Sequence, residues 1–186
     1  MTENKEKLST AGFYRLLLND LGFEARPKQD IALQQLSYFI NEPTKNSLFL
    51  LKGYAGTGKT TIISSLVKNL WKLKKTPILL APTGRAAKVI ANYSGQQAQT
   101  IHKKIYFPKN EKGGGVQFVL QPNKHKDCIF IVDEASMIPD VPNDAKLFAN
   151  GSLLDDLMQY IYNGRNCQLI LIGDTAQLPP VKLDVS

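Results

Sequence analysis

The chain has 186 residues, 43% of them hydrophobic, and its 23 basic and 16 acidic residues give a formal net charge of +7. This length suits one hydrophobic core with at most a small appendage, and no apolar run in the sequence is long enough to span a bilayer. The N-terminus is charged and has no apolar stretch behind it, so we expect no secretory signal, no membrane partner and a cytoplasmic protein. The positive charge alone is weak evidence for an anionic partner.

Two helices are predicted before the first strand. Residues 9–22 place apolar side chains at helical spacing, and Ser9 or Thr10 could cap that helix. A second helix is expected over residues 27–40, because proline suits the first position of a helix. We place Ile31, Leu36, Phe39 and Ile40 on the apolar face of this second helix.

Continuous apolar runs, typical of strands buried on both faces, then alternate with helical segments. The runs lie at residues 47–51, 77–81, 128–132 and 167–172, with helices expected after the first run as far as residue 75, at 83–93 and at 153–162. This alternation predicts an α/β domain with a parallel β-sheet flanked by helices. Cys128 and Cys167 open two of the runs and are expected to be buried, reduced thiols, since a disulfide framework or metal site would need closer spacing or more ligands.

Residues from about 105 to 126 interrupt the alternation. They include "KGGG" and "QPNKHK" and are too polar for a core, so we expect a small insertion with a β-hairpin built on "VQFVL". Residues 103–126 contain six lysines against one glutamate, a net charge of +5, with Tyr106, Phe107 and Phe118 among them. Lysines with interleaved aromatic rings suit single-stranded nucleic acid, which they bind by charge and stacking. A solvated loop is the alternative.

The segment "GYAGTGKT" matches the pattern G-x-x-x-x-G-K-[ST] between a predicted buried strand and a helix. Its glycines let the backbone curl so that N–H groups point at a phosphate, and the following helix adds its positive N-terminus. Lys59 can reach the β- and γ-phosphates of ATP, and the hydroxyl of Thr60 can bind Mg²⁺. The predicted nucleotide-binding residues of this segment are Gly53, Ala55, Gly56, Thr57, Gly58, Lys59, Thr60 and Thr61.

Asp133 and Glu134 follow the apolar run at residues 128–132. A nucleoside triphosphatase needs one carboxylate to hold the Mg²⁺ shell and a second group to orient the attacking water. We assign Asp133 to the first task and Glu134 to the second, although acids also cap helices and a helix could begin at Ala135. A GTPase fits less well, because its N-K-x-D pattern is approached only by "NKHKD", which has one residue too many.

Four further segments follow the phosphate loop in a fixed order: "APTGRAAKVI", "TIHKKI", "VDEASM" and "GDTAQLPPV". Together they resemble the first motor domain of superfamily 1 helicases, in the RecD-like branch that moves 5′ to 3′ on DNA. The resemblance implies a RecA-like P-loop NTPase domain over residues 27–186, preceded by a helical segment at 1–26. It also implies that Gln29 reads the adenine edge, and that Lys59, Glu134 and the γ-phosphate sensor Gln177 are the catalytic residues.

The resemblance implies contacts with single-stranded DNA as well. The start of the helix at 83–93 offers backbone N–H groups to a phosphate, and nearby cations add salt-dependent attraction. The insertion falls where the family places a small subdomain that helps to separate strands. The residues expected to contact DNA are Thr83, Gly84, Arg85, Lys88, Thr100 and His102.

A helicase motor hydrolyses ATP between two RecA-like domains, and the second supplies arginines to the transferring phosphate. The motifs of only one such domain are found in this sequence, so we expect the isolated chain to be weakly active or inactive. Its family would place it in a larger helicase or nuclease complex, in DNA repair or recombination. A stand-alone ATP- and nucleic-acid-binding module with little turnover is the alternative function.

Overall fold

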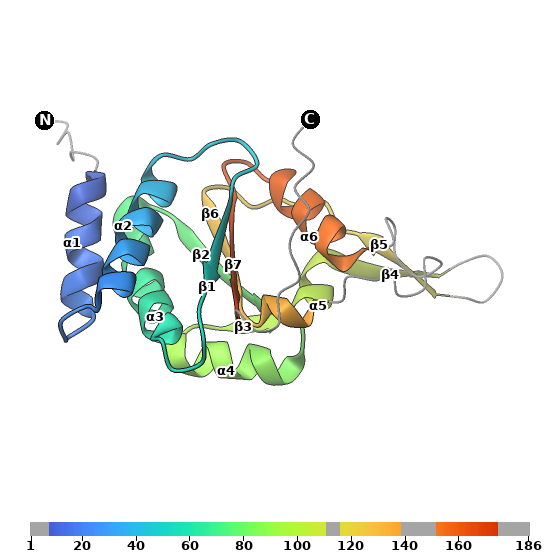
Figure 1. The fold of residues 1–186 in the computed structure, drawn as a ribbon. Helices are drawn as coiled ribbons and strands as arrows, with labels where there is room; N and C mark the ends of the chain where they lie inside the picture. The colour runs from blue at the N-terminus through green and yellow to red at the C-terminus, as the bar shows by residue number, and fades with distance from the viewer. Residues whose placement is uncertain (1–7, 111–115, 139–151, 175–186) are drawn as a thin grey trace, which may run out of the picture.

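A five-stranded parallel sheet forms the centre of the computed structural model, which describes residues 8–110, 116–138 and 152–174 (Figure 1). The strand order is β1-β7-β6-β2-β3, and every neighbouring pair is parallel. The strands are β1 (Leu48–Lys52), β2 (Thr76–Ala81), β3 (Ala98–Thr100), β6 (Cys128–Val132) and β7 (Gln168–Gly173). The predicted α/β fold with a parallel sheet is therefore confirmed.

Helices cover both faces of the sheet (Figure 1). The α-helices are α1 (Thr10–Asp20), α2 (Pro27–Asn41), α3 (Lys59–Asn69), α4 (Gly84–Ser94), α5 (Ile101–Ile105) and α6 (Leu153–Tyr162), and the short 3-10 turns are η1 (Leu70–Leu73) and η2 (Ala135–Met137). Residues of α1 to α4 pack in one large core cluster, and α5 and α6 pack in a second. Ala86 and Ala87 of α4 form a small third cluster with Ala81. The side chains of β6 alternate between the two clusters, with Ile131 in the first and Phe130 in the second. A strand buried on both faces needs apolar side chains in both directions, which explains its continuous apolar run.

The predicted insertion contains the expected hairpin. Strands β4 (Tyr106–Asn110) and β5 (Val116–Leu120) pair antiparallel and extend away from the main sheet (Figure 1). Tyr106 anchors the base of the hairpin, because its ring is buried and its hydroxyl donates a 2.5 Å hydrogen bond to Asp156 on α6. Phe107 and Phe118 remain 39% and 38% exposed, which leaves apolar surface on the hairpin.

Two features of the fold differ from the sequence-based expectation. The predicted Leu36 and Ile40 of α2 are buried, but Ile31 is 53% exposed. The predicted face of this helix was therefore wrong at Ile31. The helix packs against both α1 and β1, which moves its buried face away from that position. Strand β3 was not predicted, because its sequence "AQT" is short and polar, yet it pairs with β2 at the edge of the sheet.

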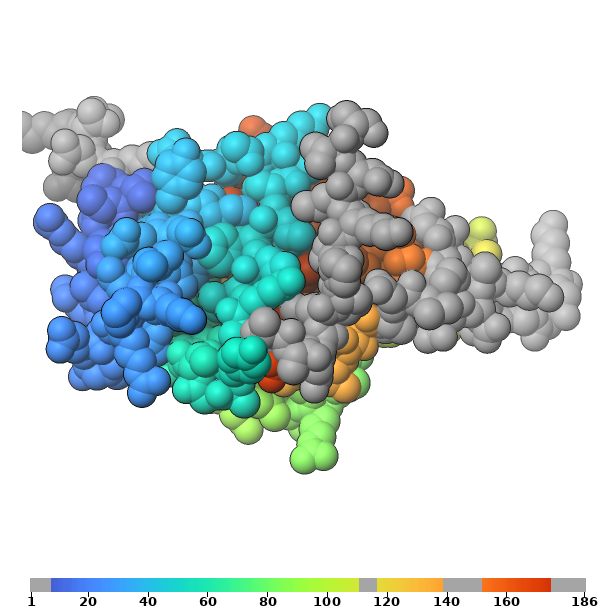
Figure 2. Space-filling view, viewed as in Figure 1, coloured from blue at the N-terminus to red at the C-terminus, as the bar shows by residue number. Residues whose placement is uncertain are grey.

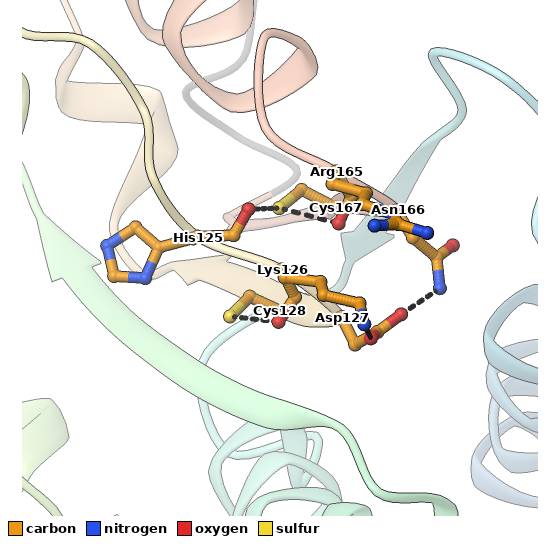
Figure 3. A network of polar contacts seen from close by, with 7 residues as sticks. All are labelled: His125, Lys126, Asp127, Cys128, Arg165, Asn166 and Cys167. Carbon is orange, nitrogen blue, oxygen red and sulfur yellow. Dashed lines mark hydrogen bonds and ion pairs between the residues drawn. The ribbon is translucent and has the colours of Figure 1, made fainter.

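The two cysteines lie side by side where β6 and β7 begin (Figure 3). Ile129 pairs with Gln168, so Cys128 and Cys167 occupy the next position of the same register. Both are free thiols, Cys128 buried and Cys167 partly buried, and each donates to a backbone carbonyl. The neighbouring Cys128 thiol is the main cause that lowers the pKa of Cys167, to about 7. Burial is as predicted for Cys128, whereas Cys167 is less buried than expected.

Among the residues that the structure describes, no helix combines the length and the hydropathy needed to cross a bilayer.

Candidate nucleotide-binding site

The phosphate loop connects the carboxyl end of β1 to the start of α3. Its backbone turns through two left-handed glycines, Gly56 at φ +75° and Gly58 at φ +88°. Gly58 caps α3, and its carbonyl accepts a 3.1 Å bond from the N–H of Ile62. The other end is tied to the sheet, because the N–H of Gly53 donates to the carbonyl of Gly173 on β7 at 3.4 Å. The loop is therefore held at both ends, and it lies at the carboxyl edge of the sheet.

Gln29 braces this loop from the first turn of α2. Its Nε2 donates to the carbonyl of Thr57 at 3.0 Å, and its Oε1 accepts from the N–H of Arg26 at 3.0 Å. The side chain is 8% exposed, and a Cβ at Gly58 would lie 2.2 Å from Nε2. Close approach therefore requires glycine at position 58. The structure places Gln29 at the loop, while its reading of adenine stays a prediction.

Lys59 folds over the loop that it follows. Its ammonium donates to the carbonyl oxygens of Gly53 and Tyr54, the second at 3.0 Å. The hydroxyl of Thr57 donates to the same Tyr54 carbonyl at 2.8 Å, so the loop is closed by its own side chains. A phosphate oxygen would form a charge-assisted bond with this ammonium, and such bonds are about twice as strong as neutral ones.

Asp133 and Glu134 follow β6 at the same edge of the sheet. Asp133 accepts from the N–H of Glu134 through Oδ1 and from the Tyr93 hydroxyl through Oδ2, both at 2.9 Å. Glu134 is exposed and holds a left-handed φ of 53°, which is strained for a residue other than glycine. Asp133 and Glu134 both line one cavity.

Tyr93 is a residue of this site that the sequence analysis missed. It lies near the end of α4, and its hydroxyl donates to Asp133. Burial, and then the negative charge of Asp133, raise the pKa of Tyr93 far above its usual value, so the hydroxyl is a proton donor at neutral pH. Its position three residues after the buried Ile90 places it on the inner face of α4. That spacing could have placed Tyr93 on the inner face of α4, but its contact with Asp133 depends on packing between elements.

These elements enclose a cavity of about 620 Å³. The predicted residues that line it are 55–61, Asp133 and Glu134. The lining residues that were not predicted are Val89, Tyr93, Ile172, Gly173 and Asp174. Its size falls within the range of small-molecule sites, about 300–1,000 Å³. The Thr60 hydroxyl and the Asp133 carboxylate are oxygen donors of the kind that Mg²⁺ prefers, so the residues of this wall fit a magnesium–nucleotide complex. Gln177 lies outside the described residues.

The predicted DNA-binding residues gather at the ends of two neighbouring strands. Thr83 caps α4 by accepting from the N–H of Ala86, and Thr100 caps α5 by accepting from the N–H of Lys103. Because Ala81 pairs with Thr100, the two helix starts lie side by side. The other members of the group, exposed to solvent, are Gly84, Arg85, Lys88 and His102. Figure 2 shows α4 exposed along the lower edge of the molecule.

His102 differs from the other members of this group. Its ring lies 5.9 Å from the ring of Tyr106, and partial desolvation lowers its pKa. At neutral pH it therefore offers a hydrogen bond to a ligand and no positive charge. Among the six predicted DNA-binding residues, Arg85 and Lys88 are the cations that would supply a salt-dependent contact.

The parallel sheet, the phosphate loop and the carboxylates at one sheet edge define a P-loop nucleotide-binding domain. A family model described as an AAA domain matches residues 37–183, and the chain belongs to this family. Its relatives confirm the resemblance to the motor domain of RecD-like superfamily 1 helicases.

Two curated relatives and one solved structure illustrate the likeness. The ATP-dependent RecD2 DNA helicase of Deinococcus radiodurans is 28% identical over 164 residues, which cover 88% of this chain and 20% of that protein. The ATP-dependent DNA helicase dda of Enterobacteria phage T4 is 34% identical over 135 residues, or 71% of this chain and 28% of that one. The HK97 bacteriophage large terminase shares the fold at a TM-score of 0.51 and 14% identity, covering 86% of this chain and 37% of its own. The chain thus spans less than a third of the length of either helicase.

Proposed function

We propose that this chain is the ATP-hydrolysing first motor domain, over residues 27–186, of a RecD-like DNA helicase that moves along single-stranded DNA. The observation that supports this most directly is the cavity at the sheet edge. The phosphate loop and the acidic end of β6 are separated by more than 70 residues of sequence, yet both line it. The helical segment at 1–26 precedes the motor domain.

The roles of the cavity residues follow from their chemistry. The N–H groups of the loop and the start of α3 bind the phosphates, and the Lys59 ammonium transfers from its carbonyl partners to the β- and γ-phosphates. Thr60 and Asp133 would hold Mg²⁺, which neutralises phosphate charge when bound. The exposed carboxylate of Glu134 orients the attacking water.

Gln29 and Gln177 complete the proposed nucleotide site. Gln29 uses one amide proton and one lone pair of Oε1 in bracing the loop, so its amide has further capacity to bond an adenine edge. Gln177 is expected to sense the γ-phosphate. It follows Asp174, which lines the cavity, by three residues, and the short connection favours this role.

Helix α4 offers a route between the nucleotide and DNA. Its first residues carry the proposed DNA contacts, and Val89 and Tyr93 line the nucleotide cavity. One rigid helix therefore borders both proposed sites. A shift of α4 on nucleotide binding would move Arg85 and Lys88 against the DNA backbone.

The remaining parts of the proposal concern the whole protein. A second RecA-like domain would supply arginines to the transition state, an effect worth about 10³- to 10⁵-fold in rate. The protein would act in the cytoplasm, in DNA repair or recombination and within a larger helicase or nuclease complex.

Replacing Lys59 tests the site, with Lys68 as the matched control. Both lysines lie on α3, but Lys68 is at its far end and exposed, 3.6 Å from Asp20. Lys59→Ala should weaken binding of a fluorescent ATP analogue with Mg²⁺ by about tenfold or more, the loss expected for a charged hydrogen bond of about 1.5–3 kcal/mol. Lys68→Ala should bind as the wild type does, and equal affinity of Lys59→Ala would contradict the site assignment.

DNA-stimulated hydrolysis separates the motor from a stand-alone binding module. The isolated chain should show little stimulation of ATP hydrolysis by single-stranded DNA, because the arginines of a second domain are needed. A protein that joins this chain to a second RecA-like domain should hydrolyse ATP rapidly with DNA present. Failure of the joined protein would favour the binding module, and robust unwinding by the isolated chain would contradict the two-domain requirement.

A further inference from the structure

We propose that Tyr93 is a positioning residue that holds the Asp133 carboxylate in the orientation that binds Mg²⁺. The inference rests on the proposed function of the site and adds to it a residue from outside the phosphate loop and the acidic strand end. Its basis is the 2.9 Å hydrogen bond from the Tyr93 hydroxyl to Oδ2 of Asp133.

The hydrogen bonds of Asp133 fix the carboxylate at both oxygens. Oδ1 accepts from the N–H of Glu134, and Oδ2 accepts from Tyr93. The backbone of Asp133 is fixed too, because its N–H donates to the carbonyl of Leu80 on β2 at 3.0 Å. Rotation of the side chain would break at least one of these bonds. Each oxygen keeps a lone pair that a Mg²⁺ ion or its bound water can use.

Tyr93 itself is held firmly. Its ring packs against the core cluster of α1 to α4, and its carbonyl accepts a 3.1 Å bond from the hydroxyl of Ser64 on α3. Helix α3, which follows the phosphate loop, is therefore hydrogen-bonded to Tyr93, the residue that we propose orients the Asp133 carboxylate. A donor on such a support places Asp133 more accurately than a mobile side chain could.

Groups that hydrogen-bond a metal ligand reduce the cost of ordering it, and their loss commonly weakens metal affinity by about 10- to 100-fold. Tyr93 should act in this way while making no direct contact with the metal. Because Tyr93 belongs to α4, it would also couple the position of that helix to metal binding.

The test measures the Mg²⁺ concentration at half-maximal binding of a fluorescent ATP analogue to the 186-residue chain. Tyr93→Phe should raise this concentration by about 10- to 100-fold. Affinity for the analogue in excess EDTA should be unchanged, because the phosphate loop is intact. An unchanged Mg²⁺ requirement, or an equal loss of affinity with and without Mg²⁺, would overturn the proposal. Tyr93→Leu also removes the hydroxyl, and it must raise the requirement as well if Tyr93→Phe does not fold.

Two controls separate positioning from general stability. Tyr106→Phe removes another tyrosine–aspartate bond, on the opposite face of the sheet, and should leave the Mg²⁺ requirement unchanged. In an Asp133→Asn background, Tyr93→Phe should add little, because residues that act through one another are not additive. A full further shift there would overturn the proposal. If the wild-type chain failed to bind the analogue at any Mg²⁺ concentration, the proposed function itself would fail, and with it this inference.

Discussion

Gly58→Ala tests whether close packing of Gln29 determines the shape of the phosphate loop. The φ of +88° at Gly58 lies in the left-handed region, where a residue with a Cβ costs about 1–2 kcal/mol. The new Cβ would lie 2.2 Å from Nε2 of Gln29, so the glutamine has to move. That movement breaks its bonds to Thr57 and Arg26, each worth about 0.5–1.5 kcal/mol. The free energy of unfolding should therefore fall by about 2–5 kcal/mol.

Gly56→Ala is the matched control for this substitution. Gly56 also has a left-handed φ, +75°, but nothing lies within 4 Å of a Cβ built there. Gly56→Ala should lower the free energy of unfolding only by the backbone cost of about 1–2 kcal/mol. Urea unfolding followed by circular dichroism would measure both variants, with the slope of the transition checked for constancy. Equal losses for the two alanines would refute the argument from Gln29.

A second background locates the cost more sharply. Gln29→Ala removes the obstructing amide, at the cost of the same two hydrogen bonds. In that background, Gly58→Ala should cost no more than Gly56→Ala does. If it retained its full cost, the strain would lie in the loop backbone alone, and Gln29 would not be a brace.

Three further predictions concern other parts of the molecule. Glu134→Gly should unfold at no lower urea concentration than the wild type, because glycine relieves the left-handed strain. The same variant should abolish DNA-stimulated hydrolysis in the two-domain protein. A clear loss of stability would contradict the argument from strain. Cys167 should react with iodoacetamide with a midpoint near pH 7, since thiolate forms as pH rises through its pKa of about 7. Cys128→Ser should change the pH midpoint of the Cys167 reaction. An identical pH profile in the two proteins would mean that Cys128 does not affect the pKa of Cys167. Salt dependence of DNA binding is measured as the slope of the logarithm of affinity against the logarithm of salt concentration. Arg85→Ala and Lys88→Ala should each reduce this slope by the equivalent of about one phosphate contact. Unchanged slopes would argue against α4 as a DNA contact.

The two sides of the cavity at the sheet edge could be placed from the sequence because their signals are local. The phosphate loop and the pair Asp133–Glu134 each follow an apolar run that reads as a buried strand. In a parallel sheet the carboxyl ends of the strands meet at one edge, so two local patterns become neighbours without any further information. The structure brings both into one cavity, as the sequence predicts.

The features that sequence reasoning missed depend on packing between elements. Strand β3 has only three residues, two of them polar, and it is a strand because β2 offers a free edge beside it. Ile31 is exposed because α1 and β1 determine which side of α2 is buried. Tyr93 is apolar enough to read as a core residue, and its contact with Asp133 joins residues 40 positions apart. No spacing rule within one element identifies such a pair.

The last prediction concerns the strained backbone beside Asp133. Of the described residues that line the nucleotide cavity, Gly56, Gly58 and Glu134 have a positive φ. Glycine serves at the two loop positions, whereas position 134 carries the carboxylate that we propose to orient the attacking water. The bond from the Glu134 N–H to Oδ1 of Asp133 is charge-assisted and worth about 1.5–3 kcal/mol, enough to offset a left-handed cost of about 1–2 kcal/mol.

Asp133 therefore has a structural task besides its proposed role toward Mg²⁺. Asp133→Asn keeps an oxygen that can accept from the Glu134 N–H, whereas Asp133→Ala keeps none. The alanine variant should consequently unfold at a lower urea concentration than the asparagine variant, by about 0.5–1.5 kcal/mol for one neutral hydrogen bond. Both should raise the Mg²⁺ concentration that nucleotide binding requires. Equal stability of the two variants would mean that the turn at Glu134 is held by other contacts, because the acceptor at position 133 would then contribute nothing to it.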